Sequence, residues 1–388
     1  MKTRTSPPLL ALALGLAILA GLLVGWVPRY WPNTVVTVAV SLVALLWAIT
    51  AKEISLPPQT ILVLPLTVWG LVQVAFQTTV LSSTTQRASV LWIMCLVAFI
   101  LGSQLLRGSR NRRMFLDLML GAAIVFAVAA ILQAFSKPVK VFGLFPAEDS
   151  VVGTLFYKNH FAVLMELTAP VALWKVLNGK LVAGGVCFAL IFAATVTSAS
   201  RAGTIIVLAE LVAFLLVSIL GRRLKLQTGL AMVAVLMVMA ATASAVVGTE
   251  VLWDRMQEKN PYLLRSRFAE STFRMVPEHP WLGYGMGTWR TVYPRFATLD
   301  MGVIVNEAHN DWAQWAAEGG LPFVALMLAL VAWLAIPAVS SVWGLGLVAV
   351  MVHAWVDYPT RQLSLQLWWF ALAGAVSQVG RDADARGN

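Results

Sequence analysis

Apolar stretches of about 20 residues recur along this chain, and they constrain its fold more than any other feature. Each is long enough for an α-helix to cross the ~30 Å hydrocarbon core of a membrane. Prolines, glycines and charged clusters divide the sequence into about twelve such stretches, near residues 9–28, 33–50, 57–77, 88–106, 114–135, 160–177, 181–199, 202–220, 227–248, 320–337, 340–357 and 362–379. The sequence therefore predicts an all-α, polytopic integral membrane protein.

The composition agrees with a membrane protein, since 59% of the residues are hydrophobic and only 12% are charged, against roughly 25% charged in soluble domains. A net charge of +10 would suggest a nucleic-acid ligand in a soluble protein. In a membrane protein the basic residues must first be assigned to loops, and we expect no nucleic-acid partner. Cys95 and Cys187 both lie in apolar runs and provide neither a disulfide framework nor a cysteine metal site.

Lysines and arginines are distributed unequally between the two sides of the predicted membrane. Fourteen of the 28 fall on the loops and tails that share a side with the N-terminus, and only seven fall on the short loops of the other side. The remaining seven lie in one long loop, residues 249–319. The positive-inside rule then places both termini in the cytoplasm, with the first apolar stretch as a retained signal anchor. The chain divides into nine helices (1–248), one long outer loop (249–319), and three helices with a short tail (320–388). The loop faces the periplasm if the cell is Gram-negative.

Within the outer loop, SRFAESTFRMVPEHP has the spacing of a short amphipathic helix. Phe268, Thr272 and Met275 fall near one stripe, and Pro277 and Pro280 end the helix. Such a helix can lie on the membrane surface.

The next segment, GYGMGTW, has three glycines that permit unusual backbone conformations or a close approach to a ligand. It does not follow a strand, as a nucleotide-binding fingerprint should. Every basic residue of the loop except Lys259 is arginine, the residue best suited to grip phosphate oxygens. This composition favours a phosphate-bearing lipid as ligand.

The loop ends in EAHNDWAQWAAEGG, in which His309 precedes a helical pattern that runs from Asn310 to Glu318. Asn310 or Asp311 is suited to cap this helix. A histidine, with an ordinary pKa of about 6.5, can accept a proton from a hydroxyl near neutral pH; the alternative is a structural histidine at an interface. Glu307, His309 and Asp311 alternate like metal ligands, but no second ligand cluster accompanies them. We therefore expect no metal.

Other ionisable residues also lie in or near apolar stretches. Arg201 in SASRAG occupies a tight connection where an ionisable group is costly and therefore often functional; alternatively, its side chain reaches ordinary lipid headgroups. Arg361 lies in a similar outward turn next to Asp357, which would neutralise it. His160 and His353 lie in or at the predicted spans, and we expect His353 to be a helix-packing hydrogen-bond donor.

Four blocks between residues 140 and 380 together resemble the O-antigen ligase and polymerase family, bacterial membrane glycosyltransferases of the GT-C class. They are GTLFYKNHFAVLMELTAPVAL, TSASRAG, RSRFAESTFRMVPEHPWLGYGMGTW and EAHNDWAQWAAEGG. The resemblance implies transfer of an undecaprenyl-pyrophosphate-linked glycan to a hydroxyl of a second glycan, with inversion and without a metal or other cofactor. It also implies a site on the periplasmic face of the bacterial inner membrane.

The resemblance assigns roles to individual residues. His309 matches the histidine that activates the acceptor hydroxyl, and Arg201 and Arg265 match arginines that hold the pyrophosphate. Arg265 is preferred to Arg267 because its distance to Pro280 fits the family spacing better. Candidates for supporting roles are Asn310, Asp311, Glu318, Arg361 and His160.

The acceptor is either a lipid A core, which would make the enzyme a ligase, or a growing glycan, which would make it a polymerase. Transfer to a serine or asparagine of a protein is a third version. A rival of another class is a flippase for lipid-linked saccharides, which would have polar residues scattered through its spans. The candidates Arg201, Arg265 and His309 instead all fall on the outer side, and this favours an enzyme.

Overall fold

The structure, a computed structural model, describes residues 8–29, 31–136, 138–247, 263–299, 302 and 304–384. Its α-helices are α1 (Pro8–Leu23), α2 (Trp31–Thr50), α3 (Thr60–Ala75), α4 (Ser82–Leu105), α5 (Ser109–Gln133), α6 (Lys158–Leu177), α7 (Leu181–Thr197), α8 (Arg201–Leu220), α9 (Leu226–Val247), α11 (Leu263–Met275), α12 (Trp289–Val292), α13 (Asp311–Ser341), α14 (Leu345–His353) and α15 (Leu363–Asp384). Short 3-10 helices are η1 (Val276–Glu278), η2 (Tyr293–Arg295) and η3 (Pro359–Arg361). The strands β1 (Lys140–Val141) and β2 (Phe145–Pro146) form one small antiparallel pair.

Six helices of the described chain are long and apolar enough to cross a membrane, namely α2, α4, α5, α6, α8 and α13. Shorter apolar helices are α1, α3, α7 and residues 363–379 of α15. The predicted all-α membrane class is confirmed, whereas the total of twelve spans stays a prediction. One predicted span differs, because α14 has nine residues and is therefore about 14 Å long. Residues 340–357 do not form a single membrane-crossing helix.

The helices pack around a core in which glycines allow close contact. An added Cβ at Gly102 of α4 would collide with the backbone of Ala371, and one at Gly374 of α15 would collide with the backbone of Phe99. Small residues at such crossings let membrane helices approach closely enough for dispersion contacts to hold them together. Helix α15 is therefore fixed along α4.

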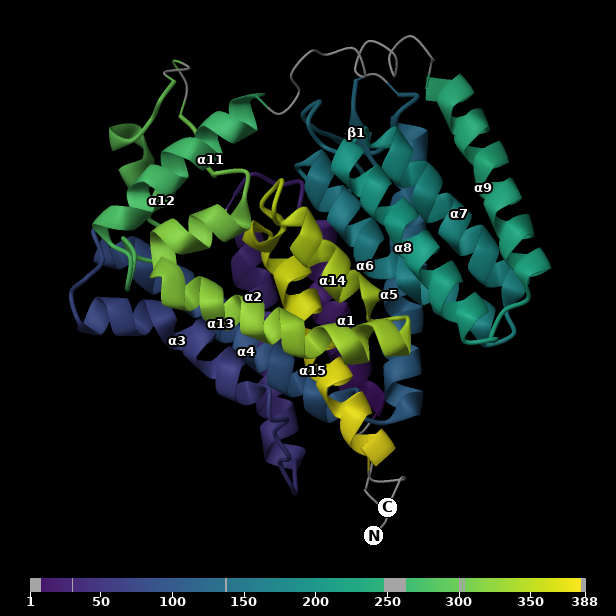
Figure 1. The fold of residues 1–388 in the computed structure, drawn as a ribbon, viewed down its shortest axis with the longest axis horizontal. Coiled ribbons are helices and arrows are strands. Elements are labelled where there is room, and N and C mark those ends of the chain that lie inside the picture. Colours follow the sequence, from purple (N-terminus) through teal and green to yellow (C-terminus); the bar gives the residue numbers. More distant parts are fainter. Residues whose placement is uncertain are drawn as a thin grey trace.

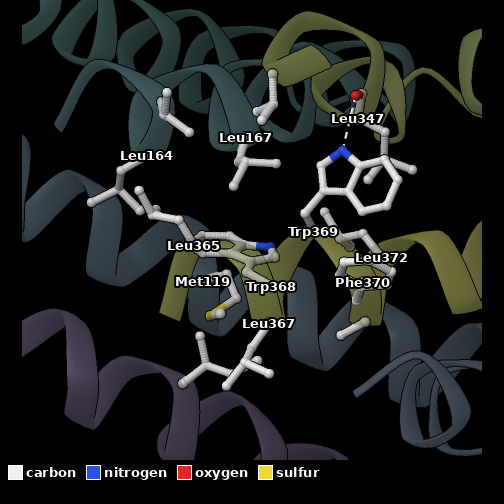
Figure 2. Close-up of a cluster of buried hydrophobic side chains, with 14 of the residues drawn as sticks. Met119, Leu164, Leu167, Leu347, Leu365, Leu367, Trp368, Trp369, Phe370 and Leu372 are labelled. Carbon is white, nitrogen blue, oxygen red and sulfur yellow. Dashed lines mark hydrogen bonds between the residues drawn. The ribbon is translucent and has the colours of Figure 1, made fainter. Parts of the chain in front are cut away.

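Two tryptophans of α15 occupy the centre of this core (Figure 2). Trp368 is fully buried and shares a cluster with Leu164 and Leu167 of α6. The indole Nε1 of Trp369 donates a 2.9 Å hydrogen bond to the carbonyl of Leu347. This bond ties α15 to α14, the short helix that leads to Asp357.

The molecule has two chemically different ends. Gly21 near the end of α1 faces Ser364 at the start of α15, so the two helices are antiparallel and the start of α1 lies near the end of α15. At the end of the molecule where α1 begins and α15 ends, the side-chain amide of Gln378 donates a hydrogen bond to the carbonyl of Ser55, in the loop before α3. We call it the basic end, because the connections between α2 and α3, α4 and α5, α6 and α7, and α8 and α9 carry the lysines and arginines of the predicted cytoplasmic side. Helices α11 and α12 lie at the upper left of Figure 1, away from the lower end of α15.

Helix α11 confirms the predicted amphipathic helix, and its stop at Met275 is followed by Pro277 in η1. Its predicted apolar stripe, however, is buried in the protein: Phe268 is 5% exposed and Met275 is fully buried. Trp289 of α12 also donates a hydrogen bond to the Thr272 hydroxyl at 2.9 Å. The expectation that this stripe rests on the membrane is therefore wrong, since α12 and α13 cover it. Residues 248–262, where the predicted loop begins, lie outside the described residues.

The glycine loop packs against α13 at the point where that helix bends. Gly285 has a φ of +114°, and an added Cβ there would collide with Thr79. The carboxamide of Gln73 in α3 donates to the carbonyls of Leu282 and Glu318. Helix α13 then breaks at Gly320, whose φ is +79°. The close approach that these glycines permit is thus made by protein and leaves this loop without a clear ligand role.

Candidate active site

His309 lies immediately before α13 in a strained backbone conformation. Its φ is +52°, in the left-handed region that side chains other than glycine seldom adopt, although histidine is among those enriched there. Asn310 is the cap, and its side-chain oxygen accepts a 2.9 Å hydrogen bond from the backbone of Ala313. The ring of His309 stacks on Phe268 and meets the ring of Tyr358 edge-on. The histidine is therefore held firmly in place while 23% of its side chain remains exposed.

Asp357, which follows α14, is the centre of the site. Its side chain is 1% exposed, and its Oδ1 lies 3.4 Å from Nδ1 of His309. Its Oδ2 lies 3.2 Å from Nη2 of Arg265 and also accepts a hydrogen bond from the Asn159 amide. The expectation that Asp357 neutralises Arg361 is wrong, since the carboxylate instead joins His309 to Arg265.

These contacts keep Asp357 ionised. Burial alone would raise its pKa, but the hydrogen-bonding contact with His309 and the positive charge of Arg265 lower the pKa to about 2. Burial and the Asp357 charge raise the pKa of the Tyr157 hydroxyl to about 12, so this hydroxyl keeps its proton. A permanent carboxylate beside the imidazole favours the tautomer with a proton on Nδ1 and leaves Nε2 as the basic atom. The 3.4 Å separation is long for a hydrogen bond, as is common before substrate binds.

Arg265, in the first turn of α11, is the arginine that contacts Asp357. Its Nη1 donates to the Val356 carbonyl at 2.8 Å, and its Nη2 donates to the Tyr157 hydroxyl at 3.3 Å. Arg267 lies at the surface instead and pairs with Glu270 at 3.1 Å. Arg265 therefore lies beside Asp357 and Tyr157, whereas Arg267 does not contact them within the described chain.

Arg361 forms a second polar cluster against the first turns of α13. Its Nη2 lies 3.0 Å from Glu318, and its Nε lies 3.6 Å from both Glu307 and Asp311. Burial lowers the pKa of Arg361, but the three carboxylates together raise it above its ordinary value. Asp311 also accepts hydrogen bonds from the backbone and hydroxyl of Thr360. These hydrogen bonds hold η3 against the start of α13 and thereby position the segment that begins at Asp357.

The alternating Glu307, His309 and Asp311 do not converge as metal ligands would. The two carboxylates face Arg361, whereas His309 faces Asp357. In the part of the chain that the structure describes, no three His, Cys, Asp or Glu side chains are arranged to hold a metal ion.

Arg201 is the first residue of α8, at the same end of the molecule. The preceding Ser200 caps this helix, and its hydroxyl accepts a 3.2 Å hydrogen bond from Gly203. Gly203 packs against Ala162 in the first turns of α6, the helix that also carries His160. The first turns of α6 therefore contact the start of α8, where Arg201 lies, and also carry His160.

A comparison with known families gave a match. Residues 186–328 match the family model described as O-antigen ligase. The match supports membership of the O-antigen ligase and polymerase family. The matched segment runs from α7 into α13 and includes Arg201, Arg265 and His309. A search of curated proteins gave no match.

Two further histidines, His160 and His353, lie at different places in the fold. Nε2 of His160 lies 3.3 Å from the Tyr358 carbonyl, so it supports the turn that follows Asp357. Nδ1 of His353 lies 2.6 Å from a carboxylate oxygen of Glu166, and both side chains are fully buried. His353 is thus a helix-packing residue, as expected, and joins α14 to α6.

The sequence patterns did not reveal Tyr157, Tyr358 or the role of Asp357. The rings of Tyr157 and Tyr358 stack at 5.4 Å beside His309. A detectable signal existed for Asp357, because an acidic residue directly after an apolar run is costly unless it has a function. The partners of Asp357 could not be predicted from the sequence, because His309 and Asp357 are separated by the whole of α13 and α14.

Proposed function

We propose that this protein transfers an undecaprenyl-pyrophosphate-linked glycan to a hydroxyl of a carbohydrate acceptor, with inversion. The observation that carries this proposal is the meeting of His309 and Arg265 at the buried carboxylate of Asp357. A base and a cation are thereby fixed within one small site, and both remain partly exposed. The family match supports glycan transfer in general.

His309 is the proposed general base. Asp357 orients the imidazole through Nδ1, and Nε2 accepts the proton of the acceptor hydroxyl. The acceptor oxygen bonds to the anomeric carbon while the bond from that carbon to the pyrophosphate oxygen breaks, and the proton stays on His309. The ionised Asp357 then stabilises the imidazolium that forms, as the aspartate of a catalytic triad does.

Arg265 and Arg201 are the proposed binding residues for the pyrophosphate. The leaving group gains negative charge, which fixed guanidinium groups stabilise without a metal ion or other cofactor. Arg265 is held in one orientation by the Val356 carbonyl and Asp357. Arg201 adds its charge at the N-terminus of α8, where helices favour anions. We assign supporting roles in this site to Asn310, Asp311, Glu318, Arg361 and His160.

We further propose that this site faces the periplasm from the inner membrane, with both termini in the cytoplasm. The support is the separation of charge along the molecule, because the basic connections lie opposite α11 and His309. Loops rich in lysine and arginine stay in the cytoplasm. The donor would then reach the site from the outer leaflet of the bilayer.

A transfer assay tests this proposal. The purified protein in detergent is given undecaprenyl-pyrophosphate-linked repeat units, with and without lipid A core, in the presence of EDTA, and the products are separated on a gel. A ladder from the donor alone would identify a polymerase, and a product that needs the core would identify a ligase. No product in either arm would contradict glycan transfer and favour translocation of the lipid-linked saccharide.

A further inference from the structure

An apolar cavity of about 290 Å³ lies between α7, α8 and the first turns of α9. Its volume is close to the lower end of the range for ligand pockets, about 300–1,000 Å³. The walls come from Val186 and Ala189 of α7, Leu211 of α8, and Thr228 and Met232 of α9. None of these residues belongs to the site around His309.

The cavity lies in the half of the helices next to the basic end. It extends along α7 from Leu181 to Ala189, which corresponds to about 12 Å of helix. Half the hydrocarbon core of a bilayer is about 15 Å thick. The cavity therefore lies at the depth of a single leaflet, the one that meets the basic loops.

Two adjacent glycines of α7 show that this space is built into the packing. An added Cβ at Gly184 would lie 2.6 Å from the Ala172 carbonyl oxygen and 2.8 Å from Val176, so Gly184 allows α7 to pack on α6. An added Cβ at Gly185, which lines the cavity, would meet nothing within 4 Å. Gly184 thus allows close contact between α7 and α6, whereas the lack of a side chain at Gly185 leaves space on the face of α7 that lines the cavity.

Basic residues lie in the chain segments next to the cavity-lining helices at the basic end. Lys180 directly precedes α7, and Arg222, Arg223 and Lys225 form the connection from α8 to α9. All four side chains are exposed. Within the described chain none of the four forms an ion pair with a carboxylate. Basic pockets between membrane helices on the cytoplasmic side are suited to anionic lipid headgroups.

We propose that this cavity binds one hydrocarbon chain of an anionic phospholipid, whose phosphate group contacts Lys180, Arg222, Arg223 and Lys225. The chain would restore the dispersion contacts that an empty apolar space lacks, and the basic residues would select the headgroup. This lipid is distinct from the glycan donor, because the proposed pyrophosphate residues Arg201 and Arg265 lie at the opposite end of the molecule. The inference does not rest on the proposed reaction.

Native mass spectrometry of the full chain, purified in detergent and stripped of lipid, tests the proposal. Phosphatidylglycerol and phosphatidylcholine with identical acyl chains are titrated separately. We expect one phosphatidylglycerol to bind at least tenfold more tightly than phosphatidylcholine. Each lysine or arginine near an anionic membrane contributes about 1 kcal/mol, or about fivefold in affinity. Arg222→Gln, Arg223→Gln and Lys225→Gln should therefore each weaken binding by about that factor.

The hydrocarbon part is tested by filling the cavity. Gly185→Leu should lower phosphatidylglycerol binding at least tenfold. Gly121→Leu is the matched control, because an added Cβ at Gly121 of α5 also meets nothing within 4 Å but Gly121 does not line the cavity. Equal affinities for the two phospholipids, or unchanged binding in Gly185→Leu, would overturn the proposal. Displacement of phosphatidylglycerol by undecaprenyl phosphate in the wild-type chain would also overturn it, by assigning the cavity to the polyprenyl lipid.

Discussion

Helices α8 and α13 begin in the same way but carry opposite charges at their first residue. Each is preceded by a residue other than glycine in the left-handed region, Ala199 with φ +58° and His309 with φ +52°. Each is then capped by a side chain, from Ser200 and Asn310 respectively. The first helical residue is Arg201 in α8 and Asp311 in α13.

We interpret this difference as one between a residue that stabilises a helix, Asp311, and one that is proposed to bind a ligand, Arg201. Helix N-termini carry a partial positive charge, which favours Asp311 and disfavours Arg201. Asp311 is also fully buried and accepts a hydrogen bond from the Thr360 hydroxyl. Arg201 gains nothing from the helix dipole, and its proposed role is to bind the pyrophosphate. At α13 the proposed base, His309, lies just outside the helix, whereas at α8 the same position is an alanine.

The largest effect should come from His309→Ala, which removes the proposed base. We expect glycan transfer to fall by about 10²–10⁴-fold, the usual contribution of a general base, with normal folding in detergent. His279→Ala is the matched control, since His279 is exposed and contacts only the ring of Tyr284 among aromatic residues of the described chain. Equal turnover rates in the two variants would refute the role of His309.

The next largest effect should come from Arg265→Lys. An ammonium group cannot reproduce the paired contacts of the guanidinium with Val356 and Asp357, so we expect transfer to fall by about 10²-fold, as for the loss of one preorganised donor. Arg267→Lys, two residues away and at the surface, should leave the rate within about twofold. Initial rates at saturating donor make the comparison, and similar losses in both variants would indicate general surface attraction.

The third prediction addresses the two helix starts directly. Arg201→Gln should reduce transfer at low donor concentration by about tenfold, while the unfolding free energy changes by no more than the ~1 kcal/mol of a helix-dipole interaction. Asp311→Asn should instead lower the thermal midpoint, because it removes a charge that pairs with Arg361. Thermal unfolding in detergent, followed beside the transfer rate, distinguishes the two. A large loss of stability in Arg201→Gln with an unchanged donor KM would reverse our interpretation.

The smallest effect should come from Ala199→Gly. The left-handed conformation costs a residue other than glycine about 1–2 kcal/mol, and the added freedom of glycine in the unfolded chain offsets about 0.4–1 kcal/mol of the gain. We therefore expect about 0.5 kcal/mol of added stability and an unchanged transfer rate. A lower thermal midpoint would show that the Ala199 methyl group has a packing role.

Local patterns of the sequence predicted the local structure well. The helix start at Asn310 and the amphipathic helix that ends before Pro277 follow from the preferences of single residues and from short-range periodicity. These features depend on neighbours within a few turns, which a single sequence displays.

Contacts between distant segments were not predictable in this way. The sequence predicted that Asp357 pairs with its neighbour Arg361. In the fold, Asp357 instead lies beside His309 and Arg265, and Arg361 pairs with Glu318 of α13. The stripe of α11 that includes Phe268 resembled a membrane-binding face, because exposure to lipid and burial against protein select the same apolar residues. Both errors arise where tertiary packing decides between partners that are chemically equivalent in the sequence.

The most direct test of the site is a double-mutant cycle between His309 and Asp357, with transfer rates measured for His309→Ala, Asp357→Asn and the double variant. Residues that act as one catalytic unit show strongly non-additive losses. We predict that the double variant transfers glycan at the rate of His309→Ala alone, because Asp357 acts by orienting and stabilising that ring. Losses that multiply in the double variant would contradict this, and would show that Asp357 works independently of His309.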